Sequence, residues 1–144
     1  ETVNDIQQSP HNPQTWVAVT QSSGAWASRD NGQSWIPFPD VPSGAALYNI
    51  TFDPTNPKRL AISSYTYGVL TSEDKGETWT TCNEGLPTPH RVWRIGVHPD
   101  TGRLLASVYQ NALFASDNFG RTWSQAGLEG SAINSFVFLP KERK

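Results

Sequence analysis

The sequence of 144 residues predicts an all-β protein built from repeated four-stranded sheets. One eight-residue motif recurs every 44 residues, beginning at Ser28, Ser72 and Ser116. Glycine and proline number 11 each and tryptophan 6, a mixture typical of short strands joined by tight turns. A period of about 40–50 residues is typical of propeller blades, so this repeat predicts three consecutive blades of a β-propeller.

Four antiparallel strands are expected in each repeat. In the second repeat they lie at about 48–53, 59–65, 68–72 and 77–82. The first of them alternates, with Ile50 and Phe52 on one side of the strand.

The chain is expected to form a single propeller segment over residues 1–144. Its repeats span approximately residues 3–46, 47–91 and 92–131. Residues 132–140 continue the pattern, and they predict the first strand of a fourth repeat.

The recurring motif predicts a tight reversal between the third and fourth strands of each repeat, which we call the box turn. Its fifth residue is glycine, which adopts a positive φ without a Cβ clash. The aspartate at its third position can accept hydrogen bonds from turn amides, and the closing tryptophan is a large apolar plate that fixes the hairpin to its sheet. The expected structural residues of the three box turns are Ser28, Asp30, Gly32, Trp35, Ser72, Asp74, Gly76, Trp79, Ser116, Asn118, Gly120 and Trp123.

This motif resembles the Asp-box, or BNR, repeat of sialidases, sortilin-type receptors, xyloglucan-cleaving glycosidases and photosystem assembly factors. The resemblance covers all three repeats and implies the propeller fold, whereas the functions of these relatives differ widely. It also implies that the box turns lie on the face away from a ligand. The third copy departs from the pattern, because Asn118 replaces the aspartate; asparagine still accepts a hydrogen bond, so we expect the turn to survive.

The loops on the other face carry most of the unusual residues. Aromatic rings beside amide and guanidinium groups suit a carbohydrate, and they equally suit a protein partner. Tyr65 and Tyr109 occupy the same position in successive repeats, which favours packing between blades as much as binding. The candidate ligand-binding residues are Tyr67, Trp93, Arg91, Arg94, Tyr48, Gln110 and Asn111.

A catalytic role is the alternative: the chain would be part of a sialidase-like or xyloglucanase-like glycoside hydrolase whose catalytic residues lie partly outside it. Such enzymes need two carboxylates that flank one bond. The candidate acids on the loop face are Asp40, Glu84 and Glu129, and none has a recognisable catalytic context. The three histidines show no metal-ligand spacing, and Cys82 has no partner cysteine, so we expect neither a metal nor a cofactor. A non-catalytic binding or assembly module is therefore the first hypothesis.

Charge and hydropathy exclude two classes of partner. The formal net charge is −2, so no basic excess exists to neutralise nucleic-acid phosphates. No apolar run approaches the ~20 residues that a membrane-spanning helix needs, so no membrane insertion is expected. The chain begins at Glu1 and contains no methionine, which fits a mature form, a fragment or a trimmed chain and leaves the localisation open.

Three blades are too few to close a ring, since propellers use about 4–8 blades. We expect either a second copy, giving a six-bladed ring, or further blades of a larger propeller. The terminal repeats would otherwise expose apolar faces, for which Trp16, Trp26, Leu113 and Phe114 are candidates. Residues 133–139 would then clasp the partner copy, replacing a first strand weakened by Gln7 and Gln8.

Overall fold

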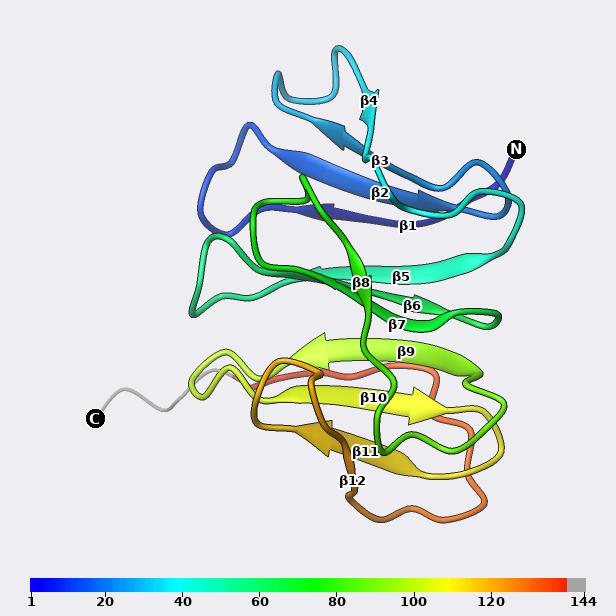
Figure 1. Ribbon diagram of the computed structural model, residues 1–144. Helices are drawn as coiled ribbons and strands as arrows, with labels where there is room; N and C mark the ends of the chain where they lie inside the picture. The colour runs from blue at the N-terminus through cyan, green and yellow to red at the C-terminus, as the bar shows by residue number, and fades with distance from the viewer. Residues whose placement is uncertain (140–144) are drawn as a thin grey trace.

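The computed structural model describes residues 1–139, which form three four-stranded antiparallel sheets (Figure 1). No helix occurs in this range, and hence none that is long and apolar enough to cross a membrane. The strands are β1 (Val3–Gln8), β2 (Trp16–Thr20), β3 (Ala25–Ser28), β4 (Ile36–Pro37), β5 (Leu47–Phe52), β6 (Leu60–Ser64), β7 (Gly68–Ser72), β8 (Thr80–Thr81), β9 (Val92–Val97), β10 (Leu104–Val108), β11 (Leu113–Ser116) and β12 (Ser124–Gln125).

Each sheet is a simple meander in which every strand pairs with the next one along the chain. We call the sheets blade 1 (β1–β4), blade 2 (β5–β8) and blade 3 (β9–β12). The blades pack face to face, and their first strands β1, β5 and β9 lie side by side (Figure 1). This arrangement confirms the predicted all-β fold of propeller blades.

The fourth strand of each blade is shorter than predicted. Residues 77–82 were expected to form a strand, whereas β8 contains Thr80 and Thr81 alone. The box turn explains the difference, because the Thr78 backbone amide donates to an Asp74 carboxylate oxygen at 2.8 Å and so is not available to a neighbouring strand. Residues of the turn therefore bond within the turn and not along the ladder.

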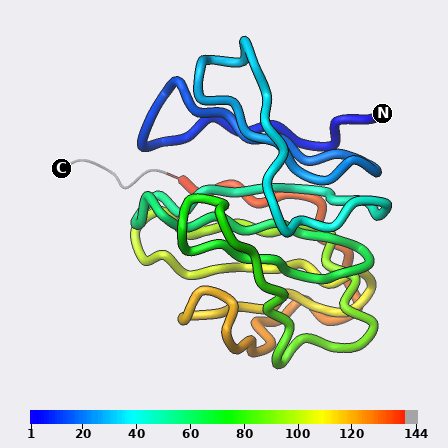
Figure 2. Tube along the Cα trace, turned by 45° about the horizontal axis from the view of Figure 1, so that its top comes forward, coloured from blue at the N-terminus to red at the C-terminus, as the bar shows by residue number. Residues whose placement is uncertain are grey.

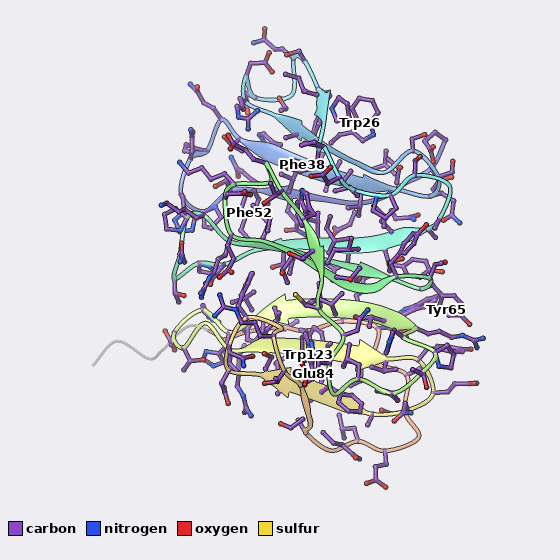
Figure 3. All side chains as sticks on the ribbon, viewed as in Figure 1. Trp26, Phe38, Phe52, Tyr65, Glu84 and Trp123 are labelled. Carbon is purple, nitrogen blue, oxygen red and sulfur yellow. The ribbon has the colours of Figure 1, made fainter. Side chains whose placement is uncertain are left out.

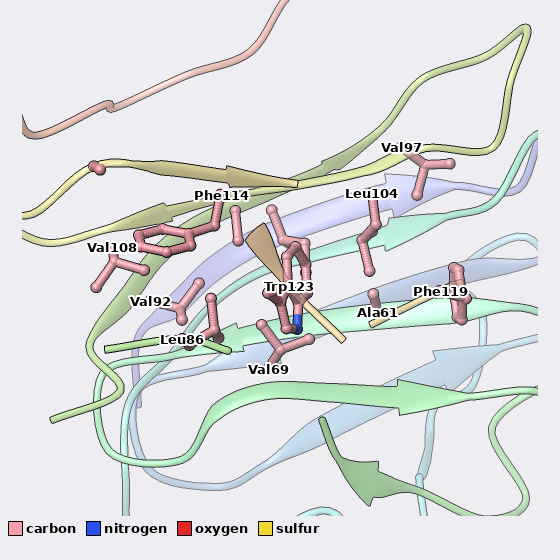
Figure 4. Packing of buried hydrophobic residues seen from close by; sticks show 13 residues of the cluster. Ala61, Val69, Leu86, Val92, Val97, Leu104, Val108, Phe114, Phe119 and Trp123 are labelled. Carbon is pink, nitrogen blue, oxygen red and sulfur yellow. The ribbon is translucent and has the colours of Figure 1, made fainter. Parts of the chain in front are cut away.

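Two apolar cores lie between the blades. The core between blades 1 and 2 contains Val17, Val19, Ile50 and Trp79. The core between blades 2 and 3 is shown in Figure 4; its buried residues are Ala61, Val69, Leu86, Val92, Ile95, Val97, Leu104, Ala106, Val108, Ala112, Phe114, Phe119 and Trp123. The expectation that Phe114 lies on a bare terminal face is wrong, because its side chain points into this core.

The prediction of a strand at 132–140 is wrong over residues 132–139, and residue 140 lies outside the described part of the chain. A strand requires a hydrogen-bonded ladder, and in the described residues no neighbour pairs with 132–139. The segment instead lies against blade 3 through side chains and a few single hydrogen bonds. By contrast β1, expected to be weak, forms a full strand paired with β2.

The three box turns share one hydrogen-bond pattern. In the first turn the Gly32 amide donates to Ser28 Oγ at 2.8 Å, and the Ser34 amide donates to an Asp30 carboxylate oxygen at 2.8 Å. The second turn repeats both bonds at the same distances. In the third turn Asn118 Oδ1 accepts from the Thr122 amide at 2.9 Å, so the substituted turn keeps its geometry.

The box-turn aspartates make stability depend on pH. Hydrogen bonds from the Ser34 hydroxyl and amide lower the pKa of Asp30 to about 2, and those from Thr78 lower the pKa of Asp74. Because the folded pKa lies below the unfolded value of about 3.9, the stabilisation is complete above that value. It is lost as the pH falls through the folded pKa.

We therefore predict that the double variant Asp30→Asn/Asp74→Asn, which copies the third turn, loses less stability on acidification than the original protein. Thermal melts at about pH 6 and about pH 2 would measure the two losses. Equal losses in both proteins would show that these carboxylates do not contribute to the acid sensitivity.

Candidate binding face

Four aromatic rings meet on the face where the loops between strands 2 and 3 of each blade gather with the connections between blades. They are Tyr48, Tyr65, Trp93 and Tyr109, which we call the aromatic cluster. Tyr48 and Trp93 lie near the starts of β5 and β9, and Tyr65 and Tyr109 follow β6 and β10. Figure 3 shows Tyr65 at this end of the blades.

Three of the rings form a tilted stack. The ring centroids of Tyr48 and Trp93 are 4.6 Å apart with an angle of 37° between the planes, and those of Trp93 and Tyr109 are 5.7 Å apart with 34°. Tyr65 packs edge to face against all three, at interplanar angles of 84°, 80° and 61°. The four rings therefore pack against one another, and each of them remains half-buried.

A cation completes the cluster. The Arg91 guanidinium carbon lies 5.1 Å from the centroid of the Tyr65 ring, in the geometry of a cation–π contact. Arg91 is exposed, and its carbonyl accepts from the Tyr109 amide at 2.8 Å, which fixes the position of its backbone. Burial raises the pKa of the Tyr48 hydroxyl, so this group stays protonated at neutral pH.

In blade 1 an amide pair takes the place of the aromatic pairs. Asn4 and Gln21 occupy the repeat positions of Tyr48 and Tyr65, and Asn4 Nδ2 donates to Gln21 Oε1 at 3.1 Å. The same nitrogen also donates to the Leu47 carbonyl at 2.9 Å, next to the cluster. The face thus combines an amide pair with two aromatic pairs.

The structure separates the residues that the sequence grouped as ligand-binding candidates. Tyr48, Trp93 and Arg91 lie in the cluster. Tyr67 packs against the core between blades 1 and 2, and the Arg94 Nε donates to the Asn134 carbonyl at 2.5 Å.

The remaining two candidates, Gln110 and Asn111, form the turn before β11, where Gln110 has a φ of 55° and Asn111 bridges to Ser131. Tyr65 and Tyr109, which sequence reasoning treated as equally suited to packing, belong to the cluster. Their common repeat position could have indicated this, since aromatic residues at the same position of neighbouring blades come together on one face.

The candidate carboxylates are dispersed over three different connections. Asp40 is a turn residue with a φ of 59°, between β4 and β5. Glu84 lies beside Trp123, whose amide donates to the Glu84 carbonyl at 2.9 Å (Figure 3). Glu129 accepts from Gln125 Nε2 at 2.7 Å. Among residues 1–139 no group of three or more His, Cys, Asp or Glu side chains could hold a metal ion.

Two hollows of the molecule lie apart from the aromatic cluster. A hollow of about 480 Å³ lies along the first strands, between Asn49, Arg94 and Phe136. A second hollow, of about 340 Å³, opens on the box-turn side between blades 1 and 2. No ring of the cluster lines either of them.

Comparison with solved structures places the chain in a structural class. An ancestral GH74 enzyme has 18% identity and a TM-score of 0.72, covering 88% of this chain and 19% of its own. The GH74 enzyme of Niastella koreensis has 16% identity and a TM-score of 0.70, with coverage of 83% and 20%. YCF48 bound to D1 peptide has 18% identity and a TM-score of 0.71, with coverage of 86% and 40%.

The fold and these likenesses define a β-propeller protein, of which the described blades are consecutive members. The chain spans about a fifth to two fifths of the length of these structures. No family model and no curated protein sequence matches it.

Proposed function

We propose that the chain is a non-catalytic binding or assembly module that holds a protein partner on the aromatic cluster. The observation that carries this proposal is the meeting of four aromatic rings and an exposed arginine on one loop face. Tyrosine, tryptophan and arginine dominate the binding energy of protein interfaces. A surface that gathers all three types without a neighbouring carboxylate pair suits binding better than hydrolysis.

The orientation of the rings favours a polypeptide over a sugar. A sugar ring stacks on an exposed flat aromatic face, and here Trp93 lies between Tyr48 and Tyr109 while Arg91 covers Tyr65. These contacts use part of the flat ring surface, and ring edges and hydroxyl groups remain available to a ligand. Ring edges carry partial positive charge, so together with Arg91 they suit carbonyl and carboxylate oxygens flanked by apolar side chains.

One of the similar structures supports the proposal of a protein partner, because that YCF48 structure contains a bound D1 peptide. The GH74 neighbours include a xyloglucanase, which supports the second candidate, a part of a carbohydrate-active glycoside hydrolase. The Asn4–Gln21 amide pair beside the rings favours this candidate, since amides bind sugar hydroxyls. The two candidates require different ligands on the same face.

The experiment exposes the purified chain to two immobilised sets of ligands: peptides that combine aromatic and acidic residues, and xyloglucan oligosaccharides. We expect binding to peptides and none to the sugars. Arg91→Ala should weaken peptide binding by about tenfold. Arg29→Ala removes an exposed arginine from the box-turn side and is the matched control, with no expected effect. Binding confined to the sugars would favour the second candidate.

We also predict that the chain hydrolyses neither sialosides nor β-glucans, because none of the candidate acids Asp40, Glu84 and Glu129 has a recognisable catalytic context. Release of reducing sugar over hours at high protein concentration would measure any turnover. Turnover that disappears on changing one of these three acids to its amide would establish the enzyme hypothesis instead.

A further inference from the structure

The smaller hollow, of about 340 Å³, lies where blades 1 and 2 meet beside their box turns, and we call it the interblade hollow. Its apolar lining residues are Val17, Ala27, Phe38, Phe52 and Leu60. Figure 3 shows Phe52 between the two blades. Arg29 of blade 1 and Lys75 of blade 2 line the hollow as well, and both are exposed to solvent. The hollow therefore combines an apolar lining with positive charge next to solvent.

Hydrogen bonds hold the turns around the interblade hollow together. His11, in the turn between β1 and β2, has its Nε2 2.7 Å from the carbonyl oxygen of Asp53, in the turn between β5 and β6. The Lys75 amide donates to the Lys58 carbonyl at 2.9 Å, which ties the box turn of blade 2 to the turn between β5 and β6. Figures 1 and 2 both show these turns at one end of the stacked blades. The hollow is therefore formed without a ligand.

The corresponding place between blades 2 and 3 is filled by an aromatic ring and an anion. Phe119 is 3% exposed (Figure 4), and the Arg59 guanidinium carbon lies 4.9 Å from the centroid of its ring. Glu73 accepts from Arg59 Nη2 at 2.9 Å and from Arg121 Nη2 at 3.0 Å, so its carboxylate lies between two guanidinium groups. A ring and a negative charge from the chain itself thus close the joint between blades 2 and 3.

The repeat position of Phe119 holds a different residue in each blade. In blade 1 it holds Asn31, whose Oδ1 accepts from Trp16 Nε1 at 3.0 Å. Since Val17 points into the core between blades 1 and 2, Trp16 points to the opposite side, which is the outer face of blade 1. In blade 2 the position holds Lys75, which lines the interblade hollow. A cation therefore lies at the position from which Phe119 fills the other joint.

The ion pairs of the filled joint are also missing between blades 1 and 2. The repeat positions of Arg59, Glu73 and Arg121, each 44 residues earlier in the chain, hold Thr15, Arg29 and Glu77. Among residues 1–139 neither Arg29 nor Lys75 forms an ion pair, with Glu77 or with any other carboxylate. Two unpaired cations therefore border the interblade hollow, whereas the other joint contains a neutralised carboxylate.

We propose that the interblade hollow binds a small aromatic phosphate monoester. The aromatic ring of this ligand lies against the apolar lining, in the place that Phe119 takes in the other joint. Its phosphate lies between Arg29 and Lys75, as the Glu73 carboxylate lies between two arginines. A phosphate monoester carries a charge of about −1.5 to −2 at neutral pH, which two cations can neutralise. Guanidinium binds phosphate oxygens in a bidentate manner, and an ammonium group binds them as a point charge.

Titration calorimetry of the whole chain with phenyl phosphate tests the site, and we expect one molecule to bind per chain. Arg29→Ala and Lys75→Ala should each weaken binding by about tenfold, because each removes one of the two cations. Lys75→Phe copies blade 3, where Phe119 adopts a φ of 54°, close to the 61° of Lys75. This variant should fill the hollow and abolish binding, and a thermal melt would verify that it folds. Arg29→Ala tests the proposal independently of that substitution.

Benzoate and inorganic phosphate are the matched ligands, because benzoate lacks the second charge and inorganic phosphate lacks the ring. We expect each to bind about tenfold more weakly than phenyl phosphate. Arg91→Ala removes an exposed arginine from the aromatic cluster and should leave the binding of phenyl phosphate unchanged.

Three results would overturn the proposal: no binding of phenyl phosphate at about 1 mM, an affinity unchanged in both alanine variants, or an equal affinity for inorganic phosphate. Each of these results leaves the proposed function intact, because the aromatic cluster lies at the other end of the blades.

Discussion

Replacing Gly85 by alanine is expected to destabilise the protein by about 3–5 kcal/mol. Gly85 has a φ of 93°, and a Cβ there would lie 2.2 Å from the Trp123 carbonyl oxygen. That neighbour is backbone, and it is held in place by the Trp123 amide, which donates to the Glu84 carbonyl at 2.9 Å. The clash cannot be relieved by turning a side chain, so the connection between blades 2 and 3 must shift.

Gly127→Ala is the control for this prediction. Gly127 has a similar φ of 100°, but a Cβ there meets nothing within 4 Å. It therefore isolates the backbone strain, which we expect to cost about 1 kcal/mol. Denaturant unfolding of both variants would measure the difference. Equal losses of stability would mean that the contact with Trp123 is not fixed.

Gly76→Val is expected to destabilise the protein by roughly 3 kcal/mol or more, combining a strained φ of 88° with a steric clash. A Cβ on Gly76 would lie 2.1 Å from Phe38 Cε1. Phe38 packs edge to face on Trp79, with ring centroids 5.4 Å apart, so moving it opens the core between blades 1 and 2.

The equivalent glycine of the first box turn supplies the comparison. Gly32 has a φ of 86° and no atom within 4 Å of a Cβ, so Gly32→Val should cost only the backbone strain. Chemical denaturation would rank the two variants. If Gly32→Val were as destabilising as Gly76→Val, the box turn itself and not the packing of Phe38 would determine the loss.

The fold could be predicted from the sequence because its determinants are local and repeated. A box turn is closed by hydrogen bonds within a few residues, as from Gly76 to Ser72 at 2.8 Å, so its motif is visible in the chain. The length of β8 could not be predicted, because it depends on how far the hydrogen bonds within the turn, such as that from the Thr78 amide to Asp74, replace the ladder. Residues 132–139 look like a strand by composition, but a ladder needs a neighbouring strand that sequence pattern cannot supply.

The candidate site could be predicted only in part, because the packing of adjacent blades decides which residues come together. Tyr48, Trp93 and Arg91 were found because they lie in loops expected on one face. Tyr67 lies in the same loop as Tyr65, two residues away, yet it packs against the core while Tyr65 joins the cluster. The packing of adjacent blades determines which of the two rings points outward. Alternation along a short loop does not predict this orientation.

Tryptophan fluorescence tests most directly whether the aromatic cluster is the binding surface. Trp93 is in the cluster, and it is one of 6 tryptophans. A peptide selected from the immobilised set should change the fluorescence of the original protein and of Trp16→Phe, while Trp93→Phe should lose most of the change. A change that survives in Trp93→Phe and disappears in Trp16→Phe would contradict the account, because it would place the peptide on the outer face of blade 1.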